Sequence, residues 1–212
     1  IPEKFKLKDV IGLGKALSEI ELDSELTKIS KKNKTNIIPF VGNGIYDHYI
    51  PKVVDFIASR SEFYTAYTPY QAEVSQGTLQ CLYEYQSMIC ALTGMDIANA
   101  SLYDGASAIA EACMMSMHIS KKSTILYSEG LFDNYIKVMK TCLSGQNIEY
   151  IPIPLKNGIT NIDFIYDKID ENIASIIIQS PNKFGLIENL ISIKKTLNNH
   201  KTLLISSSNP IA

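Results

Sequence analysis

The sequence predicts an α/β fold with a largely parallel sheet flanked by helices. Short apolar segments alternate with helical patterns over the second half of the chain, and this alternation is typical of βαβ units. The first part of the chain has helical patterns without such segments. We therefore expect an N-terminal helical arm over residues 1–60 and an α/β large domain over residues 61–212.

The expected strands are short and apolar. They are Ile97–Ser101, Thr124–Tyr127, Ile148–Ile151, Ser175–Gln179 and Thr202–Ser206. The helices between them are expected near Ala106–His118, Tyr135–Leu143, Ile162–Ile169 and Asn189–Leu197. Because ligands bind beyond the carboxyl ends of parallel strands, we expect a site in the loops that lead from these strands into helices.

The arm carries two short helical patterns. One follows Ser18 and has apolar residues at helical spacing. Pro51 suits the first turn of the other helix, whose apolar face is expected to be buried. The apolar residues are Leu22, Leu26 and Ile29 in the first and Ile50, Val54 and Ile57 in the second. His48, beside Asp47, has two readings: a site residue held by the carboxylate, or a capping or packing residue.

The segment 64–77 is dense in aromatic and hydroxyl groups but has no regular core pattern. Pro69 lacks an amide donor and disfavours a helix, so we expect an extended or turning loop. On an extended backbone Tyr64 and Tyr70 would face one way and Tyr67 the other. These tyrosines could line a site or interface, or they could fill a groove between elements with their hydroxyls at its rim.

A long helix is expected directly after this loop. Ser75 is suited to cap it, apolar residues recur at three- and four-residue steps, and Gly94 supplies a stop. The amides at the start of such a helix favour anionic groups. The candidate residues that line a site or interface here are Tyr64, Thr65, Tyr67, Thr68, Pro69, Tyr70, Gln76 and Gly77.

A second loop, Asp104-Gly105-Ala106-Ser107, opens the helix after the first expected strand. Gly105 would let a backbone come close, and the helix N-terminus offers amides to a phosphate. Asp104 would repel a phosphate there, whereas as an N-cap it would satisfy the same amides. The loop is therefore either a structural cap or a degenerate phosphate-type loop.

Composition excludes several function classes. The formal net charge of -2 gives no reason to expect nucleic acid or an anionic membrane as partner. No window is apolar for long enough to span a bilayer, and the first residues lack the apolar run of a signal peptide, so we expect a cytoplasmic protein. The cysteines form no metal-ligand pattern with the histidines, so no metal site and mostly buried, reduced thiols are expected. They are Cys81, Cys90, Cys113 and Cys142.

Several segments together resemble subunit 1 of the two-subunit glycine cleavage system P-protein. They are Phe40–Pro51, Ser59–Glu62, Tyr64–Gly77, Leu79-Gln80, Glu84–Gln86, Leu92–Asp96, Ala98–Ser101 and Gln179–Gly185. The resemblance implies a large domain like that of fold-type I pyridoxal phosphate (PLP) transferases. Members of this family are much longer than this chain, so the resemblance also implies that this large domain is incomplete.

The resemblance implies one subunit of a heteromeric, PLP-dependent glycine dehydrogenase (aminomethyl-transferring). That complex decarboxylates glycine and transfers the aminomethyl group to the lipoyl arm of the H-protein. P-protein subunit 2 would bind PLP covalently. This chain would lack the Schiff-base lysine, would line or support the site, and would be inactive in isolation. No catalytic residue is assigned to it, and its expected partners are subunit 2, lipoyl H-protein and glycine.

Three positions depart from a complete cofactor site. Asn209 stands where an aspartate that pairs with the pyridine nitrogen would be sought, and an amide cannot stabilise that protonated nitrogen as a carboxylate does. Lys183 is the lysine in a site-like loop, and an exposed turn residue is the alternative. The segment 129–134 lacks the histidine-proline pair expected in the family. Two competing readings are a non-enzymatic α/β interaction or scaffold module and independent cofactor binding by this chain.

Overall fold

The computed structural model describes residues 1–8, 12–38, 40, 42, 44, 46–198 and 200–211. The chain divides into two compact units, Ile1–Phe40 and Val41–Ala212. Each is described by itself. The domain boundary expected at residue 60 stays a prediction.

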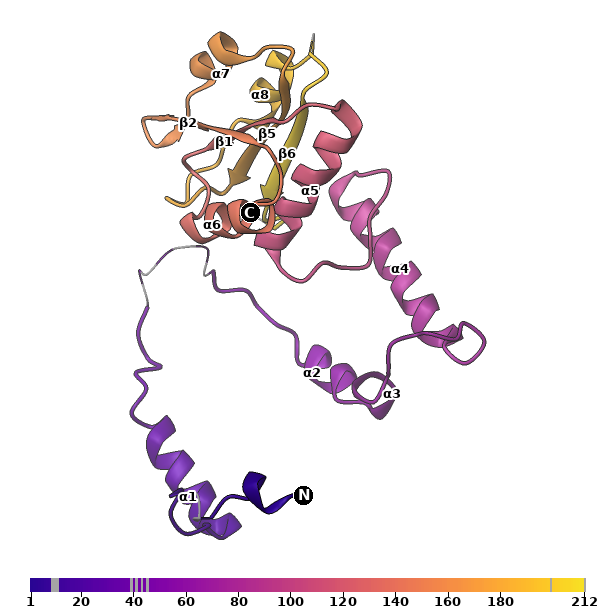
Figure 1. Ribbon diagram of the computed structural model, residues 1–212, viewed down its shortest axis with the longest axis vertical. Helices are drawn as coiled ribbons and strands as arrows, with labels where there is room; N and C mark the ends of the chain where they lie inside the picture. The colour runs from indigo at the N-terminus through magenta and orange to yellow at the C-terminus, as the bar shows by residue number, and fades with distance from the viewer. Residues whose placement is uncertain are drawn as a thin grey trace. The chain divides into compact units, whose positions relative to one another are not determined.

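The first unit contains the short 3₁₀ helix η1, Glu3–Phe5, and the helix α1, Glu19–Ser30 (Figure 1). Ser18 and Glu21 form a capping box at the start of α1, which explains why the helix begins there. The helix predicted after Ser18 is thereby confirmed. Its apolar residues Leu22, Leu26 and Ile29 are about half exposed within the described chain.

The second unit is built on a parallel sheet of four strands, in the order β2-β1-β5-β6. The strands are β1 Thr124–Ser128, β2 Glu149–Ile153, β5 Ile173–Ser180 and β6 Leu203–Ser208. Every neighbouring pair is parallel, which confirms the predicted sheet. Four of the predicted strands are therefore found.

The fifth predicted strand, Ile97–Ser101, is wrong. The segment is irregular and Ile97 is 86% exposed. No neighbouring strand among the described residues pairs with it. The carbonyl of Ala98 instead accepts a hydrogen bond from Gln86 Nε2 at 2.6 Å, which ties the segment to the preceding helix. A strand without a ladder partner has no hydrogen-bonding advantage over an irregular backbone.

A small hairpin was not predicted. Strands β3, Leu155–Lys156, and β4, Ile159–Thr160, pair antiparallel around Asn157 and Gly158, whose φ angles are +55° and +80°. An Asn-Gly pair between two strands is the strongest short hairpin signal because both residues tolerate positive φ.

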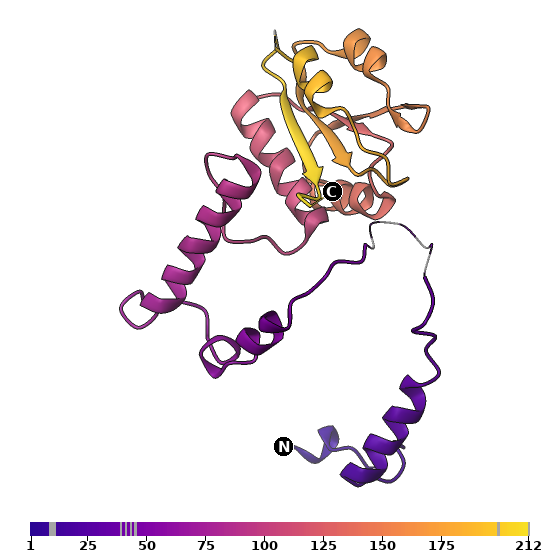
Figure 2. The same ribbon diagram turned by 180° about the vertical axis from the view of Figure 1, so that it is seen from behind.

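Helices cover both faces of the sheet (Figures 1 and 2). The core cluster containing Ile125, Tyr127 and Ile177 packs against α5, Gly105–Ser120, and α6, Asp133–Cys142. The alternate residues of the same strands belong to the other core cluster, which packs against the helices α7, Ile162–Lys168, and α8, Leu190–Thr196. Strand side chains alternate between faces, so a continuous apolar strand such as β5 serves both cores. The four helices predicted in this region are confirmed.

Three helices precede this core. They are α2 Lys52–Ala58, α3 Ser61–Tyr64 and α4 Gln76–Thr93, and none contains a buried residue. Ile50, Val54 and Ile57 are 63%, 48% and 42% exposed, so the buried face predicted for α2 is wrong within the described chain.

The long helix α4 is confirmed. Gly94 ends it in the left-handed conformation with φ +70°, which glycine adopts without steric cost. Ser75 occupies the N-cap position, but its side chain makes no capping hydrogen bond. The first turn of α4 is therefore held by its backbone alone.

The cysteines differ in exposure. Cys113 is buried, Cys90 is intermediate, and Cys81 and Cys142 are exposed, so the expectation of mostly buried thiols is wrong. All four lie on helices, and only Cys113 points into the core. The described residues include no group of three or more potential metal ligands. No helix in the described ranges is long and apolar enough to cross a membrane.

Candidate functional site

A pocket of about 370 Å³ lies at the carboxyl ends of β5 and β6, where parallel sheets bind ligands. The ends of the strands and the residues just beyond them contribute Gln179, Ser180, Pro181, Ser207, Ser208 and Asn209. The aromatic part of the wall is Tyr46, His48, Phe132 and Tyr135. The volume of the pocket falls in the range of small-molecule sites.

Gln179 connects the end of β5 to the start of α6. Its Oε1 accepts a hydrogen bond from the backbone N–H of Phe132 at 3.0 Å, and its side chain is only 4% exposed. One turn further along α6, Tyr135 meets the Phe132 ring edge to face, with the ring centroids 5.3 Å apart and an interplanar angle of 88°. These contacts hold both aromatic rings beside the strand ends.

Asn209 is held in a similar way at the end of β6. Its backbone N–H donates to the carbonyl of Ser180 at 3.1 Å, and its Oδ1 accepts from the N–H of Ile211 at 3.0 Å. The side-chain amides of Gln179 and Asn209 therefore both have their oxygen engaged by a backbone donor. This fixes which end of each amide is the oxygen.

Gly44 places the preceding segment against this wall. It has φ +83°, and a Cβ built on it would lie 2.5 Å from Cζ of Phe132. Only glycine allows both the positive φ and this close approach. His48 follows and lines the pocket. Within the described residues His48 makes no hydrogen bond to Asp47, so a site residue oriented by that carboxylate is not supported.

A buried polar network supports the loops beside the pocket. Glu188 is 6% exposed and accepts hydrogen bonds from Thr160 N at 3.0 Å and from Asn182 Nδ2 at 2.8 Å. Its own N–H donates to Ser180 Oγ at 3.2 Å, and Ser180 lines the pocket. The carboxylate thus ties the hairpin strand β4 and the loop after β5 together. This network depends on contacts that the sequence pattern did not indicate.

Lys183 lies outside the pocket wall. Its Nζ is 3.1 Å from Asp133 Oδ1, at the first residue of α6, and its side chain is 27% exposed. Its backbone N–H donates to the carbonyl of Gly130 at 2.8 Å. Lys183 is therefore a partly buried ion-pair residue and not the exposed turn residue that was the alternative.

The loop at the start of α5 is capped by its own side chain. Asp104 Oδ1 accepts from Ser107 N at 2.7 Å and from Ser107 Oγ at 2.6 Å, while Asp104 N donates to Ser107 Oγ at 3.1 Å. These bonds from Ser107 hold the pKa of the Asp104 carboxyl below its ordinary value. The N-cap predicted at Asp104 is confirmed.

Tyr135 also approaches this helix start. A Cβ built on Gly105 would lie 2.6 Å from the Tyr135 hydroxyl oxygen. The first turn of α5 is thus crowded by Tyr135 on one side and capped by Asp104 on the other. A phosphate-binding role for Asp104, Gly105, Ala106 and Ser107 stays a prediction.

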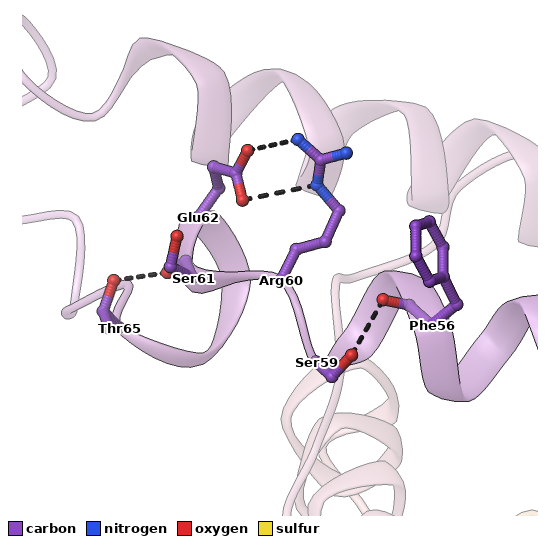
Figure 3. Close-up of polar contacts among 6 residues, drawn as sticks. All are labelled: Phe56, Ser59, Arg60, Ser61, Glu62 and Thr65. Carbon is purple, nitrogen blue, oxygen red and sulfur yellow. Dashed lines mark hydrogen bonds and ion pairs between the residues drawn. The ribbon is translucent and has the colours of Figure 1, made fainter.

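The segment 64–77, called the tyrosine loop below, begins at the last residue of α3. Figure 3 shows the entry to it: Arg60 Nε lies 3.3 Å from Glu62 Oε2, and the Thr65 hydroxyl donates to the carbonyl of Ser61. The hydrogen bond from Arg60 lowers the pKa of the Glu62 carboxyl. These contacts lie at the two ends of the single turn of α3.

The loop then makes a tight turn at Pro69. The N–H of Tyr70 donates to the carbonyl of Thr68 at 2.8 Å, as in a three-residue turn. The rings of Tyr67 and Tyr70 consequently lie 6.1 Å apart, at 49° to each other. The expectation that Tyr67 would face away from Tyr70 is therefore wrong, because the backbone turns where an extended chain was assumed. The prediction of a non-helical loop is confirmed for residues 65–75, whereas Tyr64 ends α3 and Gln76 and Gly77 begin α4.

The tyrosine loop is highly exposed. Tyr67 and Tyr70 are each 80% exposed, and Tyr64 is 69% exposed. They do not fill a groove between elements of the described chain. Gln76 Nε2 donates to Glu73 O at 3.3 Å, and the space around Gly77 is open. None of the described residues that line the strand-end pocket comes from this loop.

Comparison with known proteins agrees with this geometry. Residues 1–212 match the family model for the glycine cleavage system P-protein. The protein described as "Probable glycine dehydrogenase (decarboxylating) subunit 1" in Bacillus subtilis (strain 168) is 47% identical over 214 residues, which is 100% of this chain and 48% of the relative. The corresponding Bacillus mycoides (strain KBAB4) protein is 45% identical, with the same coverage. The chain thus spans about half the length of the curated relatives it matches.

Solved structures show the same fold. A crystal structure of glycine decarboxylase (P-protein) of the glycine cleavage system, in inhibitor-bound form, has a TM-score of 0.87 and 34% identity, and the match covers 100% of this chain and 47% of that one. Sphingosine-1-phosphate lyase of Burkholderia pseudomallei K96243 has a TM-score of 0.65 and 13% identity, covering 95% and 49%. The second match shows the fold alone.

The parallel sheet covered by helices on both faces, with its pocket at the strand ends, defines an α/β chain of the fold-type I PLP enzyme class. The match over its whole length then assigns it more closely. The chain belongs to the glycine cleavage system P-protein family.

The side chains of this pocket do not fit PLP. None of the described residues that line it is aspartate, glutamate, lysine or arginine. The residue that the resemblance implies as the partner of the pyridine nitrogen is Asn209, and an amide does not stabilise a protonated nitrogen as a carboxylate does. Asp104 accepts a hydrogen bond from the first-turn amide of Ser107 in α5. The described lining residues therefore do not include the charged groups that such a cofactor requires.

Proposed function

We propose that this chain is the non-catalytic half of a PLP-dependent glycine decarboxylase. In this proposal it pairs with P-protein subunit 2 in the cytoplasm, and subunit 2 binds PLP covalently. The complex decarboxylates glycine and transfers the aminomethyl group to lipoyl H-protein. The bound cofactor would supply the electron sink for decarboxylation.

The observation that carries this proposal is the uncharged pocket at the strand ends. Asn209 carries an amide where the family resemblance implies a carboxylate, and no lysine is among the described lining residues. In this proposal a partner subunit supplies the reactive group. The relatives described as subunit 1 support the existence of a second subunit.

The tyrosine loop is proposed to support the site of the assembled enzyme. The neighbouring rings of Tyr67 and Tyr70 and the hydroxyl of Thr68 lie beside a hollow of about 540 Å³ near the start of α4. Exposed aromatic side chains are typical of surfaces that bind another molecule. In the complex these groups would exclude water and orient the lipoyl arm or glycine.

The second candidate is a non-enzymatic α/β scaffold. The exposed apolar side chains of α2 and α4 favour it, because such surfaces mark sites of protein contact. Val53, Phe56, Met88 and Leu92 are between 58% and 63% exposed. A scaffold of this kind would bind subunit 2 but would not influence its reaction.

One experiment separates the two candidates. The chain is assembled with subunit 2 and PLP, and glycine-dependent exchange of carbon dioxide is measured with lipoylated H-protein. Replacing both tyrosines (Tyr67→Ala with Tyr70→Ala) should lower exchange by at least about tenfold without loss of assembly. Tyr166→Ala, at a 71% exposed tyrosine of α7, is the matched control and should leave exchange unchanged.

Assembly with subunit 2 is measured for each variant alongside carbon dioxide exchange. Unchanged exchange in the double variant, with assembly intact, would favour the scaffold. Absence of any exchange in the wild-type mixture, under conditions where an active P-protein shows exchange, would refute the enzymatic proposal itself.

A further inference from the structure

A cluster of methionine thioethers and one imidazole lies on the C-terminal half of α5. Three of the six methionines of the chain, Met114, Met115 and Met117, are close together in sequence, and His118 follows them directly. All four line one hollow of about 710 Å³. Thioether sulfur and imidazole nitrogen are both ligands of Cu(I), so the cluster has the donor atoms of a copper site.

The helix places three of these donors on one stripe. Met114 precedes His118 by four positions and Met115 precedes it by three, and side chains at these spacings are neighbours on a helix surface. Helical side chains also lean back toward the N-terminus, so His118 lies over the turn that carries both methionines. The spacing therefore brings the imidazole within reach of both sulfurs.

Core packing explains only part of the cluster. Met114 and Met117 are partly buried and pack against the core cluster that contains Cys113. Met115 is 59% exposed, and His118 is also exposed. Within the described ranges His118 makes no hydrogen bond. Filling the core therefore accounts for neither Met115 nor His118.

The buried side of α5 holds this stripe in place. Ser116 is fully buried, and its Oγ donates to the carbonyl of Cys113 at 2.8 Å and lies 2.9 Å from Ser175 Oγ on β5. The helix is thus tied to the sheet directly beneath the cluster. Ligands on a rigid helix are held more precisely than ligands on a loop.

The charges around the cluster suit a monovalent cation. Glu111 precedes the two ligand methionines by three and four positions and adds one carboxylate to the lining. The C-terminal end of α5 carries the negative end of the helix dipole, which also favours a cation. The ammonium of Lys122 is engaged with the carbonyl of Ile173 at 3.3 Å, and Lys121 lies at the C-cap, beyond the last turn. Neutral thioethers and imidazole would leave the second charge of a divalent ion uncompensated.

The usual ligands of zinc do not gather at this surface. Histidine, cysteine, aspartate and glutamate form no group of three or more that could hold a metal ion in the part of the chain that the structure describes. The expectation of no metal site rests on cysteine and histidine spacing, and thioethers lie outside it. A metal bound on α5 would therefore depend on sulfur ligands, which zinc does not take from methionine.

We propose that Met114, Met115 and His118 form a binding site for Cu(I), with Glu111 balancing the charge of the ion. The site shares no described lining residue with the strand-end pocket. The inference goes beyond the proposed function, because it assigns this chain a metal ion that takes no part in decarboxylation.

Methyl NMR tests the site residue by residue. The chain is labelled at its methionine methyl groups, assembled with unlabelled subunit 2, and titrated with Cu(I) without oxygen. Cys81→Ser and Cys142→Ser remove exposed thiols that would compete for the ion. The signals of Met114 and Met115 should shift and saturate, whereas Met88, 61% exposed on α4, should not shift. Zn(II) should bind at least about tenfold more weakly than Cu(I).

Two variants test the ligands. Met115→Leu keeps the size and apolar character of the side chain and removes only the sulfur. It should weaken Cu(I) binding by about tenfold or more, measured from the Met114 signal, and His118→Gln should do the same. Both positions are exposed, so both variants are expected to fold. Met88→Leu and His200→Gln are matched controls at exposed positions outside the cluster and should leave binding unchanged.

Three results would each overturn the inference. They are methyl signals of Met114 and Met115 that do not respond to Cu(I), a folded Met115→Leu variant that binds Cu(I) as the wild type does, and tighter binding of Zn(II) than of Cu(I). Carbon dioxide exchange is measured separately. Absence of Cu(I) binding with normal exchange therefore refutes this inference and leaves the proposed function standing.

Discussion

The side-chain carbonyl of Gln179 accepts a hydrogen bond from the backbone N–H of Phe132 at 3.0 Å. This contact joins residues 47 positions apart in the chain and sets the distance between the end of β5 and the start of α6. The aromatic wall of the strand-end pocket depends on it.

Replacing Gln179 by alanine should therefore destabilise the fold. The N–H of Phe132 would lose its acceptor in a buried position, at a cost of about 1–3 kcal/mol in the free energy of unfolding. Urea unfolding measures the change. Gln146→Ala, at an exposed glutamine, is the control and should have little effect. Equal stability of the two variants would show that this hydrogen bond is not important for the pocket wall.

Gly44→Ala should also perturb the pocket. The added Cβ would lie 2.5 Å from the Phe132 ring, and the backbone has φ +83°. Strain of this kind costs about 1–3 kcal/mol, and the ring or the segment must move. Gly145→Ala is the control, because nothing lies within 4 Å of its Cβ position. The two variants are compared by urea unfolding and by the NMR shifts of Phe132, and matching results would contradict the contact.

The sequence pattern was most informative where local and tertiary requirements coincide. The apolar run of β5 predicted a strand. The run is continuous because both faces of β5 pack against helices. The segment Ile97–Ser101 has a similar local pattern, but it pairs with no strand among the described residues and is irregular. The hairpin at Asn157 and Gly158 has a local signal, because both residues adopt positive φ at the turn.

The pocket was harder to predict for a physical reason. Its donors and walls come from chain positions as distant as Gly44 and Asn209, and their contacts exist only in the folded chain. Asn209 was singled out from the sequence and lies in the pocket. Gln179 ended a predicted strand, but its bond to Phe132 had no sequence signal. The paired rings of Tyr67 and Tyr70 likewise depend on a turn that spacing does not reveal.

Asp104→Ala should lower the melting temperature by removing the cap of α5. Hydrogen bonds from Ser107 hold the pKa of Asp104 below 3.8, so the cap stabilises the fold above that pH and is lost as the pH falls through the lowered pKa. The difference in melting temperature between wild type and variant should shrink in strong acid. Asp104→Asn retains an N-cap oxygen and should recover most of the stability at neutral pH. A difference that stays constant with pH would contradict this role.

Cys113 should make stability fall in alkaline solution. Burial raises the pKa of its thiol from 9.0 to about 12, so the folded chain retains a proton that the unfolded chain releases between these values. The free energy of unfolding should therefore decrease as the pH rises through this window. Cys113→Ala should reduce that decrease, although it leaves a small cavity. Cys142→Ala, at an exposed thiol, is the control and should keep the wild-type pH dependence.

The central claim is that this chain supports a reaction whose cofactor is held by subunit 2. The most direct test is to assemble the two subunits with PLP, reduce the complex with borohydride so that the cofactor is fixed to the lysine that holds it, and map the labelled peptides by mass spectrometry. The account predicts a label on subunit 2 and none on this chain. A stoichiometric label on a lysine of this chain would contradict it.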